Sequence, residues 1–517
     1  MIKKISLYFV LVLTLVTLIA CRDDEPKDPT VVPTEPTEVI DLFDINPQND
    51  IYYQLFVRSF ADSNDDGIGD LNGITENLDY LESLGITALW LLPINPSPSY
   101  HGYNITDYYD IESDYGTLAD FENLINEAEN RNIKIVIDLV INHTSDQHPW
   151  YTSARQGSSS PYRDYYIWNN GVAFESFVGG MKDLNFNNEA VKQEVKDIMD
   201  FYLEMGVHGF RIDAAKHLLE GGNVSINNSL LLHEFNTHIK ANYPNSFIVS
   251  EVFDYYYQML SDYYIGSDSV FNFYMASNVW DKIGNGNTRY LFSSNLKKAY
   301  DDYRFINPDF VDSPFIGNHD LDRIASMQGF NGVNSLEKLK LAASVLLTLP
   351  GSPFIYYGDE LGMKGVRYEG TNIPGYGVVY DEYRRQPLKW GNQFIETTWL
   401  PSDGTNNETE SIMEQQANEH SLLRFYQEMI QLRKSNPALM FGNYFEEYKD
   451  NSSNIQGYIR YYEHEDIKQA VLVIHNFSLT AQTLDIPYLE LLFNDLTLEP
   501  FETVIMTIDP LLIGDYI

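Results

Sequence analysis

The chain has 517 residues, of which 44% are hydrophobic and 21% charged, so it is long enough for several domains and too apolar to be largely disordered. It carries 74 Asp and Glu against 34 Lys and Arg, a formal net charge of -40. A surface of this sign repels phosphate backbones, which argues against a nucleic-acid partner and favours a neutral ligand or a cation.

The first 20 residues have the layout of a secretory signal peptide, because Lys3 and Lys4 precede a mostly apolar run over 5–20. This run is shorter than the roughly 20 residues that a membrane-spanning helix needs. It ends in LIAC (18–21), which resembles the lipobox of bacterial lipoproteins, with Cys21 as the acylated first residue. An ordinary signal peptide followed by a chance cysteine is the alternative. We expect an extracellular lipoprotein that meets the membrane only through a lipid anchor on Cys21.

Residues 21–45 are rich in Pro, Thr and acidic residues, which is typical of a disordered tether. From about residue 50, short apolar runs alternate with amphipathic segments. The predicted strands are 51–60, 86–93, 133–140, 209–215, 247–253, 269–275, 313–320 and 353–361. The alternation predicts an α/β fold with a parallel sheet, and eight units predict a closed (β/α)8 TIM barrel, here formed by 46–143 and 186–435.

Two stretches break the alternation. Residues 144–185 are polar, have no helical period and follow the third strand, so we expect an inserted domain over the mouth of the barrel. After a predicted helix at 421–434, strand and turn signals dominate 436–517, which predicts a C-terminal antiparallel β-sandwich domain.

Polar residues follow four of the predicted strands at their C-terminal ends, where barrel enzymes place their sites. The four segments are DLVINH (138–143), GFRIDAAKH (209–217), SEVF (250–253) and FIGNHD (315–320). Their acids Asp213, Glu251 and Asp320 should converge on one rim. A helix cap or a structural salt bridge would explain one such acid, but three acids, with Arg211 on the same strand face as Asp213, indicate a functional site.

In order and spacing these four segments resemble the recurring regions of the α-amylase family of retaining glycoside hydrolases. The resemblance runs from about residue 50 to the C-terminus and is weakest in the β domain. It implies that Asp213 is the nucleophile, that Glu251 is the acid/base, and that Asp320 binds the sugar 2- and 3-hydroxyls. These roles agree with the chemistry of a retaining glycosidase, which requires a nucleophilic carboxylate and an acid/base carboxyl about 5–5.5 Å apart. We expect Arg211 to favour ionised Asp213, and the apolar FIVS run to raise the pKa of Glu251.

The resemblance also implies substrate contacts. Tyr103 is similar to the family's tyrosine that stacks under the cleaved sugar, and His143 and His319 would donate hydrogen bonds to its hydroxyls. Lys216 and His217 would contact sugars beyond the cleavage point. For each histidine the alternative is a rim residue whose ring is satisfied by the protein itself.

Two calcium sites are predicted. Asn142, Asp183 and the backbone carbonyl of His217 resemble ligands of the family's structural Ca²⁺, and all three offer the oxygen atoms that a hard cation requires. A second Ca²⁺ would bind the loop after the first strand, which resembles an EF-hand loop at alternate positions but has Gly73 at the twelfth. Its candidate ligands are Asp62, Asn64, Asp66, Ile68 and Asp70. A solvated Asp/Asn turn is the alternative for this loop.

The bond that is cleaved is less well determined. Lys216 and His217 favour endo-cleavage of α-1,4 bonds in starch, maltodextrin and maltooligosaccharides. However, MKDLN (181–185) fits neither the amylase nor the α-1,6 form, and RRQPLKW (384–390) also resembles oligoglucosidases and neopullulanases. An oligo-α-glucosidase or a neopullulanase-like hydrolase therefore stays open, and a non-catalytic glucan-binding lipoprotein is a remote alternative. We expect a monomer.

Overall fold

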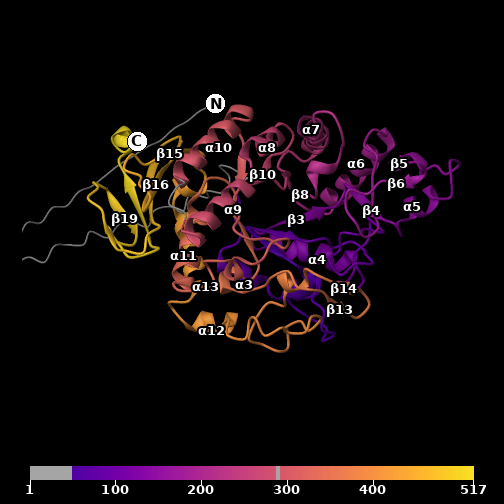
Figure 1. The fold of residues 1–517 in the computed structure, drawn as a ribbon, viewed down its shortest axis with the longest axis horizontal. Helices are drawn as coiled ribbons and strands as arrows, with labels where there is room; N and C mark the ends of the chain where they lie inside the picture. The colour runs from indigo at the N-terminus through magenta and orange to yellow at the C-terminus, as the bar shows by residue number, and fades with distance from the viewer. Residues whose placement is uncertain (1–48, 287–290) are drawn as a thin grey trace, which may run out of the picture. The chain divides into compact units, whose positions relative to one another are not determined.

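The computed structural model describes residues 49–286 and 291–517 (Figure 1). The predicted signal peptide and tether lie outside these residues. Within them, every helix is too short or too polar to span a bilayer.

Eight parallel strands form the predicted barrel. They are β1 Tyr52–Leu55, β2 Ala88–Leu91, β3 Lys134–Leu139, β8 Gly209–Ile212, β9 Phe247–Ser250, β10 Ser269–Phe271, β11 Val311–Ser313 and β12 Phe354–Tyr356. Their order is β11-β10-β9-β8-β3-β2-β1-β12, and a parallel bridge between Phe315 and Phe354 brings the two ends of the sheet together. The barrel is therefore nearly closed, and its strands are buried on both faces, as their apolar runs require.

All eight predicted strands extend past the C-terminal ends of the observed ones. In 269–275 the helix α9 (Phe273–Val279) already begins, and in 353–361 a 3-10 turn forms at Asp359–Leu361. The first and seventh strands differ most. The first ends at Leu55, and Val57–Phe60 instead form the short helix α1, all four residues of which are buried. The observed seventh strand, Val311–Ser313, shares only Ser313 with the predicted range 313–320. After the bridge at Phe315 the chain leaves the sheet, and the Ile316 carbonyl accepts a hydrogen bond from the Trp280 indole at 2.8 Å. The residues after Ile316 are thereby available to the site.

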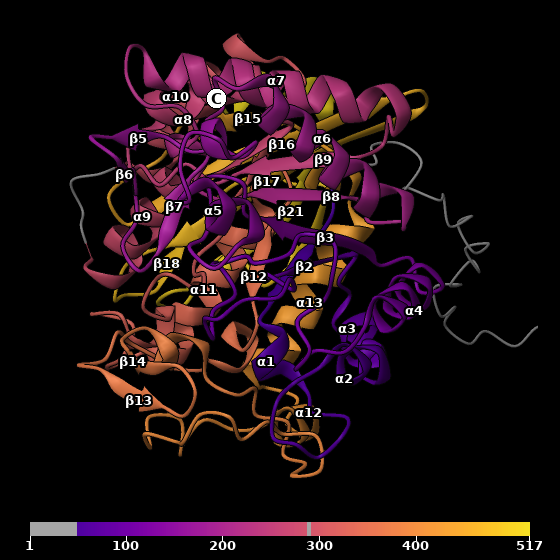
Figure 2. The ribbon, with the colours of Figure 1, turned by 90° about the vertical axis from the view of Figure 1, so that its right-hand side faces the viewer.

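Helices surround the strands, and in Figure 2 β2, β3 and β8 lie between α7 on one side and α2 to α4 on the other. These helices are α2 Leu71–Glu76, α3 Leu78–Leu84, α4 Leu118–Glu129, α6 Glu189–Glu204, α7 Val224–Asn242, α9 Phe273–Val279, α10 Phe292–Ile306, α11 Ser335–Thr348 and α13 Leu422–Ser435. Gly85 ends α3 in a left-handed conformation, with φ 93°.

The barrel interior is an aromatic layer beneath the site. The ring of Phe271 lies 5.1 Å from that of Trp90 and 4.8 Å from that of Phe354, which in turn stacks on Tyr52 at 4.2 Å. The guanidinium of Arg211 lies over Trp90, 5.3 Å from its ring centroid. The polar groups at the C-terminal ends of the strands therefore lie above an apolar layer.

The polar stretch after β3 forms small elements of its own. β4 His143–Ser145 pairs antiparallel with β7 Met181–Asp183, and α5 Pro149–Ala154 and the pair β5 Trp168–Asn169 and β6 Val172–Ala173 lie between them. Figure 1 shows α5, β5 and β6 at the right, beyond the barrel strands.

A second irregular segment was indicated in the sequence only by RRQPLKW (384–390). Residues 362–411, all of them described, contain the hairpin β13 Thr371–Ile373 and β14 Gly377–Val379 and a 3-10 turn at Glu382–Arg385, and α12 Ile412–Ala417 follows. The turn brings Arg385 to the site, where it contacts Asp320.

The C-terminal domain is an antiparallel sheet, as predicted. Its five strands, in the order β15-β16-β17-β21-β19, are β15 Tyr444–Glu447, β16 Ile455–His464, β17 Ile467–Asn476, β21 Thr503–Ile508 and β19 Glu490–Phe493, and β18 Gln482–Thr483 pairs separately with β20 Thr497–Leu498. Ile459, Leu472 and Met506 are among its buried core residues. A hydrogen bond joins this domain to the barrel domain, because the Lys282 ammonium donates to the carbonyl of Ser453 at 2.8 Å.

Candidate active site

A cavity of about 520 Å³ is lined by residues that follow the barrel strands. It brings together most of the predicted site residues, namely Tyr103, His143, Asp213, Lys216, His217, Glu251 and Asp320. Arg211 and His319 lie buried against it. The other lining residues were not predicted as site residues, and they are His101, Phe177, Met181, Ala214, Phe253, Asp381 and Arg385.

One guanidinium organises the acids. Arg211 is only 1% exposed, and its Nη1 lies 2.7 Å from Oδ1 of Asp138 and 2.7 Å from Oδ1 of Asp213. Its Nη2 lies 3.2 Å from Oε2 of Glu251. Because both predicted reactive carboxyls are bonded to the same planar group, they lie within the span of one guanidinium and its hydrogen bonds, which is compatible with the short separation that a retaining glycosidase needs.

The backbone after β8 also holds Glu251. Ala214 has a left-handed conformation, with φ 48°, and its amide donates to Oε2 of Glu251 at 3.0 Å. The amide of Ala215 donates to the Glu251 carbonyl at 3.1 Å. The ends of β8 and β9 are thereby joined through the two residues that follow Asp213.

Burial controls the protonation of these acids. It raises the pKa of Glu251 to about 7, although Arg211 acts in the opposite direction. Burial also raises the pKa of Asp213 above its ordinary value, and Arg211 opposes this too. Arg211 therefore lowers the pKa of Asp213, as expected from the sequence, but burial and the neighbouring charge of Asp320 outweigh it.

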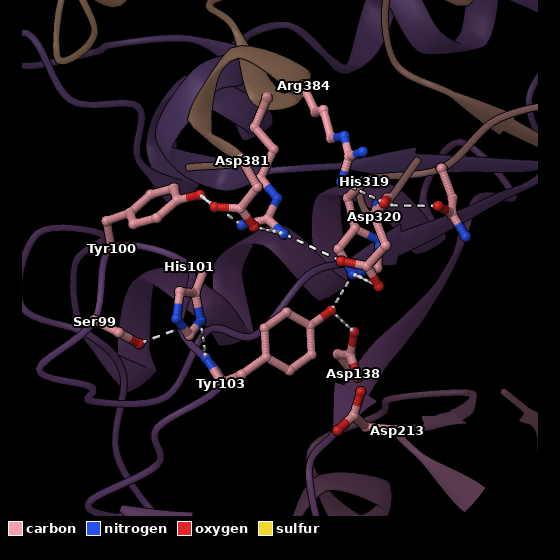
Figure 3. Close-up of polar contacts among 12 residues, drawn as sticks. Ser99, Tyr100, His101, Tyr103, Asp138, Asp213, His319, Asp320, Asp381 and Arg384 are labelled. Atoms are coloured by element: carbon pink, nitrogen blue, oxygen red, sulfur yellow. Dashed lines mark hydrogen bonds and ion pairs between the residues drawn. The ribbon is translucent and has the colours of Figure 1, made fainter. Parts of the chain in front are cut away.

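Tyr103 and His319 form a hydrogen-bonded pair (Figure 3). Nδ1 of His319 faces the Gln54 amide nitrogen at 2.7 Å, so Nδ1 accepts and Nε2 carries the proton. That nitrogen lies 2.6 Å from the Tyr103 hydroxyl, which donates to Oδ2 of Asp138 at 2.9 Å. Burial holds the pKa of His319 well below its usual range, so the ring is neutral and the Tyr103 hydroxyl is fixed in one orientation.

Asp320 is the most accessible of the three acids, with 41% of its side chain exposed. Its Oδ2 lies 3.3 Å from Nε2 of His319, and its Oδ1 lies 3.2 Å from Nη2 of Arg385. The same Arg385 nitrogen lies 2.9 Å from Asp381, whose other oxygen accepts from the Tyr100 hydroxyl (Figure 3). The turn at 382–385 thus completes this side of the cavity.

The predicted sugar contacts differ in how far the protein itself satisfies them. Nε2 of His143 lies 3.1 Å from the Tyr103 carbonyl, and burial lowers the pKa of this histidine to about 4, so it is a neutral ring with an internal partner that still lines the cavity. The Lys216 ammonium lies 2.8 Å from Asp254. The His217 ring packs against Phe177 with centroids 5.2 Å apart.

The first predicted calcium site has a suitable set of donors. Oδ1 of Asn142 is buried and has no hydrogen-bond donor. Asp183 is paired with His143 across β4 and β7, and its carboxylate accepts from the Ser176 amide and hydroxyl. A buried amide oxygen without a donor suits a cation, so the donor chemistry of Asn142 and Asp183 fits Ca²⁺. In the described residues, no group of three or more His, Cys, Asp or Glu side chains is arranged to hold a metal, and this set contains only one carboxylate.

The second predicted site is arranged as a closed turn. Both carboxylate oxygens of Asp62 accept backbone amides, from Asn64, Asp65 and Gly67. Asp70 accepts from the Ser63 amide and caps α2. This is the pattern of an Asp/Asn turn, so the second site depends on the sequence motif alone.

The profile of the family described as "Alpha amylase, catalytic domain" matches residues 54–176 and 172–442 of this chain. The chain belongs to the α-amylase family. It is accordingly a glycoside hydrolase, with the barrel and C-terminal sheet of that family.

Relatives of this α-amylase family member are named for different activities. "Alpha-amylase 3" of Dictyoglomus thermophilum is 38% identical over 507 residues, which cover 89% of this chain and 93% of that protein. An oligo-1,6-glucosidase of Bacillus cereus is 30% identical over 531 residues, with coverages of 84% and 92%. The crystal structure of an α-amylase from H. orenii superposes with a TM-score of 0.78 at 33% identity, and covers 89% of this chain and 99% of that one.

Proposed function

We propose that this glycoside hydrolase cleaves internal α-1,4-glucosidic bonds of starch, maltodextrin and maltooligosaccharides with retention of configuration. The observation that carries the proposal is the bonding of Asp213 and Glu251 to the single guanidinium of Arg211 at the wall of the cavity. The presence of Lys216 and His217 shortly after Asp213 supports endo-cleavage of α-1,4 bonds.

In the proposed mechanism, protonated Glu251 donates its proton to the glycosidic oxygen while Asp213 attacks C1 and forms a glycosyl ester. The leaving chain departs with that proton. Ionised Glu251 then takes a proton from water, which attacks C1 and releases Asp213. The raised pKa of Glu251 suits both steps, because a group that titrates near 7 exists in both forms at neutral pH. Arg385 would hold Asp320 toward the sugar hydroxyls.

A second candidate is an oligo-α-glucosidase or neopullulanase-like hydrolase that acts on short α-1,4 or α-1,6 glucans. It is favoured by the oligo-1,6-glucosidase relative and by the RRQPLKW segment, whose Arg385 contacts Asp320.

Product analysis on maltoheptaose and pullulan, run side by side, tests the proposal. Early mixed maltooligosaccharides from maltoheptaose, with little action on pullulan, are expected. Early release of glucose alone, or faster hydrolysis of pullulan, would favour the second candidate. Glu251→Gln, which keeps the shape of the side chain, is the inactive control.

Two further proposals concern how the enzyme is held together and where it acts. Ca²⁺ bound by Asn142, Asp183 and the His217 carbonyl would join the segment 144–185 to the barrel. The enzyme would act outside the cell as a monomer, attached to the bacterial membrane through acylated Cys21.

A further inference from the structure

We propose that an exposed row of three aromatic side chains, Phe253, Tyr255 and Tyr256, extends the substrate site outside the cavity and binds glucose units beyond the cleavage point of a linear α-glucan. The inference rests on the proposed function and deepens it, because it specifies the length of chain that the site takes.

The row begins in the cavity and leads out of it. Phe253 lines the cavity two residues after Glu251, and 46% of it is exposed. The ring of Tyr255 lies 5.5 Å from that of Phe253, and Tyr255 is 40% exposed. Tyr256 follows and is 71% exposed. Adjacent large aromatic side chains that remain this accessible mark a binding surface rather than a core.

A buried ring and a half-buried ring pack against the inner side of the row. Phe273 is fully buried, and its ring lies 4.7 Å from Phe253 and 6.3 Å from Tyr255. The Trp280 ring lies 6.3 Å from Tyr255 at an interplanar angle of 78°. These contacts involve only the inner sides of Phe253 and Tyr255. Packing against the protein therefore does not explain why the outer sides of these two rings, and most of Tyr256, are aromatic and exposed.

Asp254 attaches the row to the rim of the cavity. Its Oδ2 lies 2.8 Å from the Lys216 ammonium, and its Oδ1 accepts the Tyr256 amide at 3.0 Å. Lys216 lines the cavity and, under the proposed function, contacts sugars on the leaving-group side of the cleaved bond. The backbone of the row is therefore bonded to that side of the site.

The chemistry of the surface selects its occupant. A glucan chain is neutral, and its sugar rings have apolar faces with hydroxyls at their edges. Tyrosine offers the complementary combination of an apolar ring and a polar tip. A net charge of -40 disfavours a polyanion at the same place. Because the row is continuous with the cavity, its occupant is the same chain that is being cleaved.

The experiment uses Tyr255→Ala and Tyr256→Ser with maltotriose and maltoheptaose labelled at the reducing end. Losing a stacking contact should lower kcat/KM for maltoheptaose roughly three- to tenfold in each variant and leave maltotriose nearly unchanged. Cleavage should also move toward the labelled end, since units on the leaving-group side are no longer held.

Phe305→Ala is the matched control. Phe305 is 87% exposed at the end of α10, which leads into the start of β11 and so lies at the end of the barrel away from the cavity. This variant should behave as wild type. Equal loss on both substrates, or an unchanged cleavage pattern in both tyrosine variants at unchanged Tm, would overturn the inference. Wild-type enzyme that leaves both maltooligosaccharides intact would instead overturn the proposed function.

Discussion

The backbone amide of Ala214 donates a hydrogen bond of 3.0 Å to Oε2 of Glu251. Ala214 directly follows Asp213, so the residue after the proposed nucleophile holds the proposed acid in place. Its φ of 48° lies in the left-handed region, which residues with a side chain seldom occupy. Such strain persists only where the surrounding structure enforces it, and here it directs the amide at Glu251.

Substitution of Ala214 should therefore affect catalysis through backbone conformation. Ala214→Val places a β-branched side chain where φ is positive, at a cost of about 1–3 kcal/mol, and relaxation of this strain would turn the amide away from Glu251. We expect kcat to fall roughly ten- to hundredfold on maltoheptaose. Ala214→Gly should stay close to wild type because glycine tolerates the conformation. Equal activity of the two variants would show that the left-handed turn is not required.

The activity should depend on pH through both carboxyls. Because Glu251 has a pKa raised to about 7, it is protonated below that value, and kcat/KM should fall as the pH rises through about 7. Because the pKa of Asp213 is also raised, the activity should fall again at acid pH, where this group gains a proton and cannot attack. The measurement is kcat/KM on maltoheptaose between pH 4 and about 9, a range that brackets both groups.

Glu251→Gln assigns the alkaline limb. With maltoheptaose this variant should lose roughly 10²- to 10⁴-fold in activity. A substrate with a good leaving group, such as an α-maltosyl fluoride, needs no protonation, so it should react with the variant at a rate that no longer falls above neutral pH. An alkaline limb that persists in the variant would point to another group.

Much of the barrel could be predicted from the sequence because its physical causes are local. A run such as KIVIDL, buried on both faces, can only be an inner strand, and the repeat of strand and helix fixes the topology. The convergence of Asp213, Glu251 and Asp320 followed from the same rule, since the C-terminal ends of parallel strands meet at one rim.

The far side of the cavity could not be predicted in this way. Asp381 and Arg385 come from the irregular segment after β12, which has no hydrophobic period, and their approach to Asp320 depends on tertiary packing. Only the similarity of RRQPLKW to oligoglucosidases indicated that this segment matters. The internal partners of His143 were also invisible in the sequence, because they include the backbone carbonyl of Tyr103.

Removal of Ca²⁺ should destabilise the enzyme. An ion bound only by the folded state contributes about 2.7 kcal/mol at a free concentration of 100 times Kd, so EDTA should lower Tm and added Ca²⁺ should restore it. Asp183→Asn should abolish this dependence, because Asp183 is the one carboxylate of the first proposed site.

Asp62→Asn is the matched variant for the second predicted site, where the carboxylate already accepts three backbone amides. Two bound ions per chain in the wild type, and one in this variant, would establish the second site. A wild-type stoichiometry of one, lost only with Asp183→Asn, would leave the loop at 62–70 as a turn.

The proposed lipid anchor can be tested with a single substitution, because Cys21 is the only cysteine in the chain. Acyl chains on its sulfur and on its amino group would hold the protein firmly, since two chains bind a bilayer far more tightly than one. Cys21→Ser removes the sulfur that accepts the first lipid, so the enzyme should move from the membrane fraction to the medium with its activity on maltoheptaose unchanged. Labelling of the wild type with a fatty-acid probe, absent in the variant, checks the chemistry directly. Membrane association that survives the substitution would show that something other than Cys21 retains the enzyme.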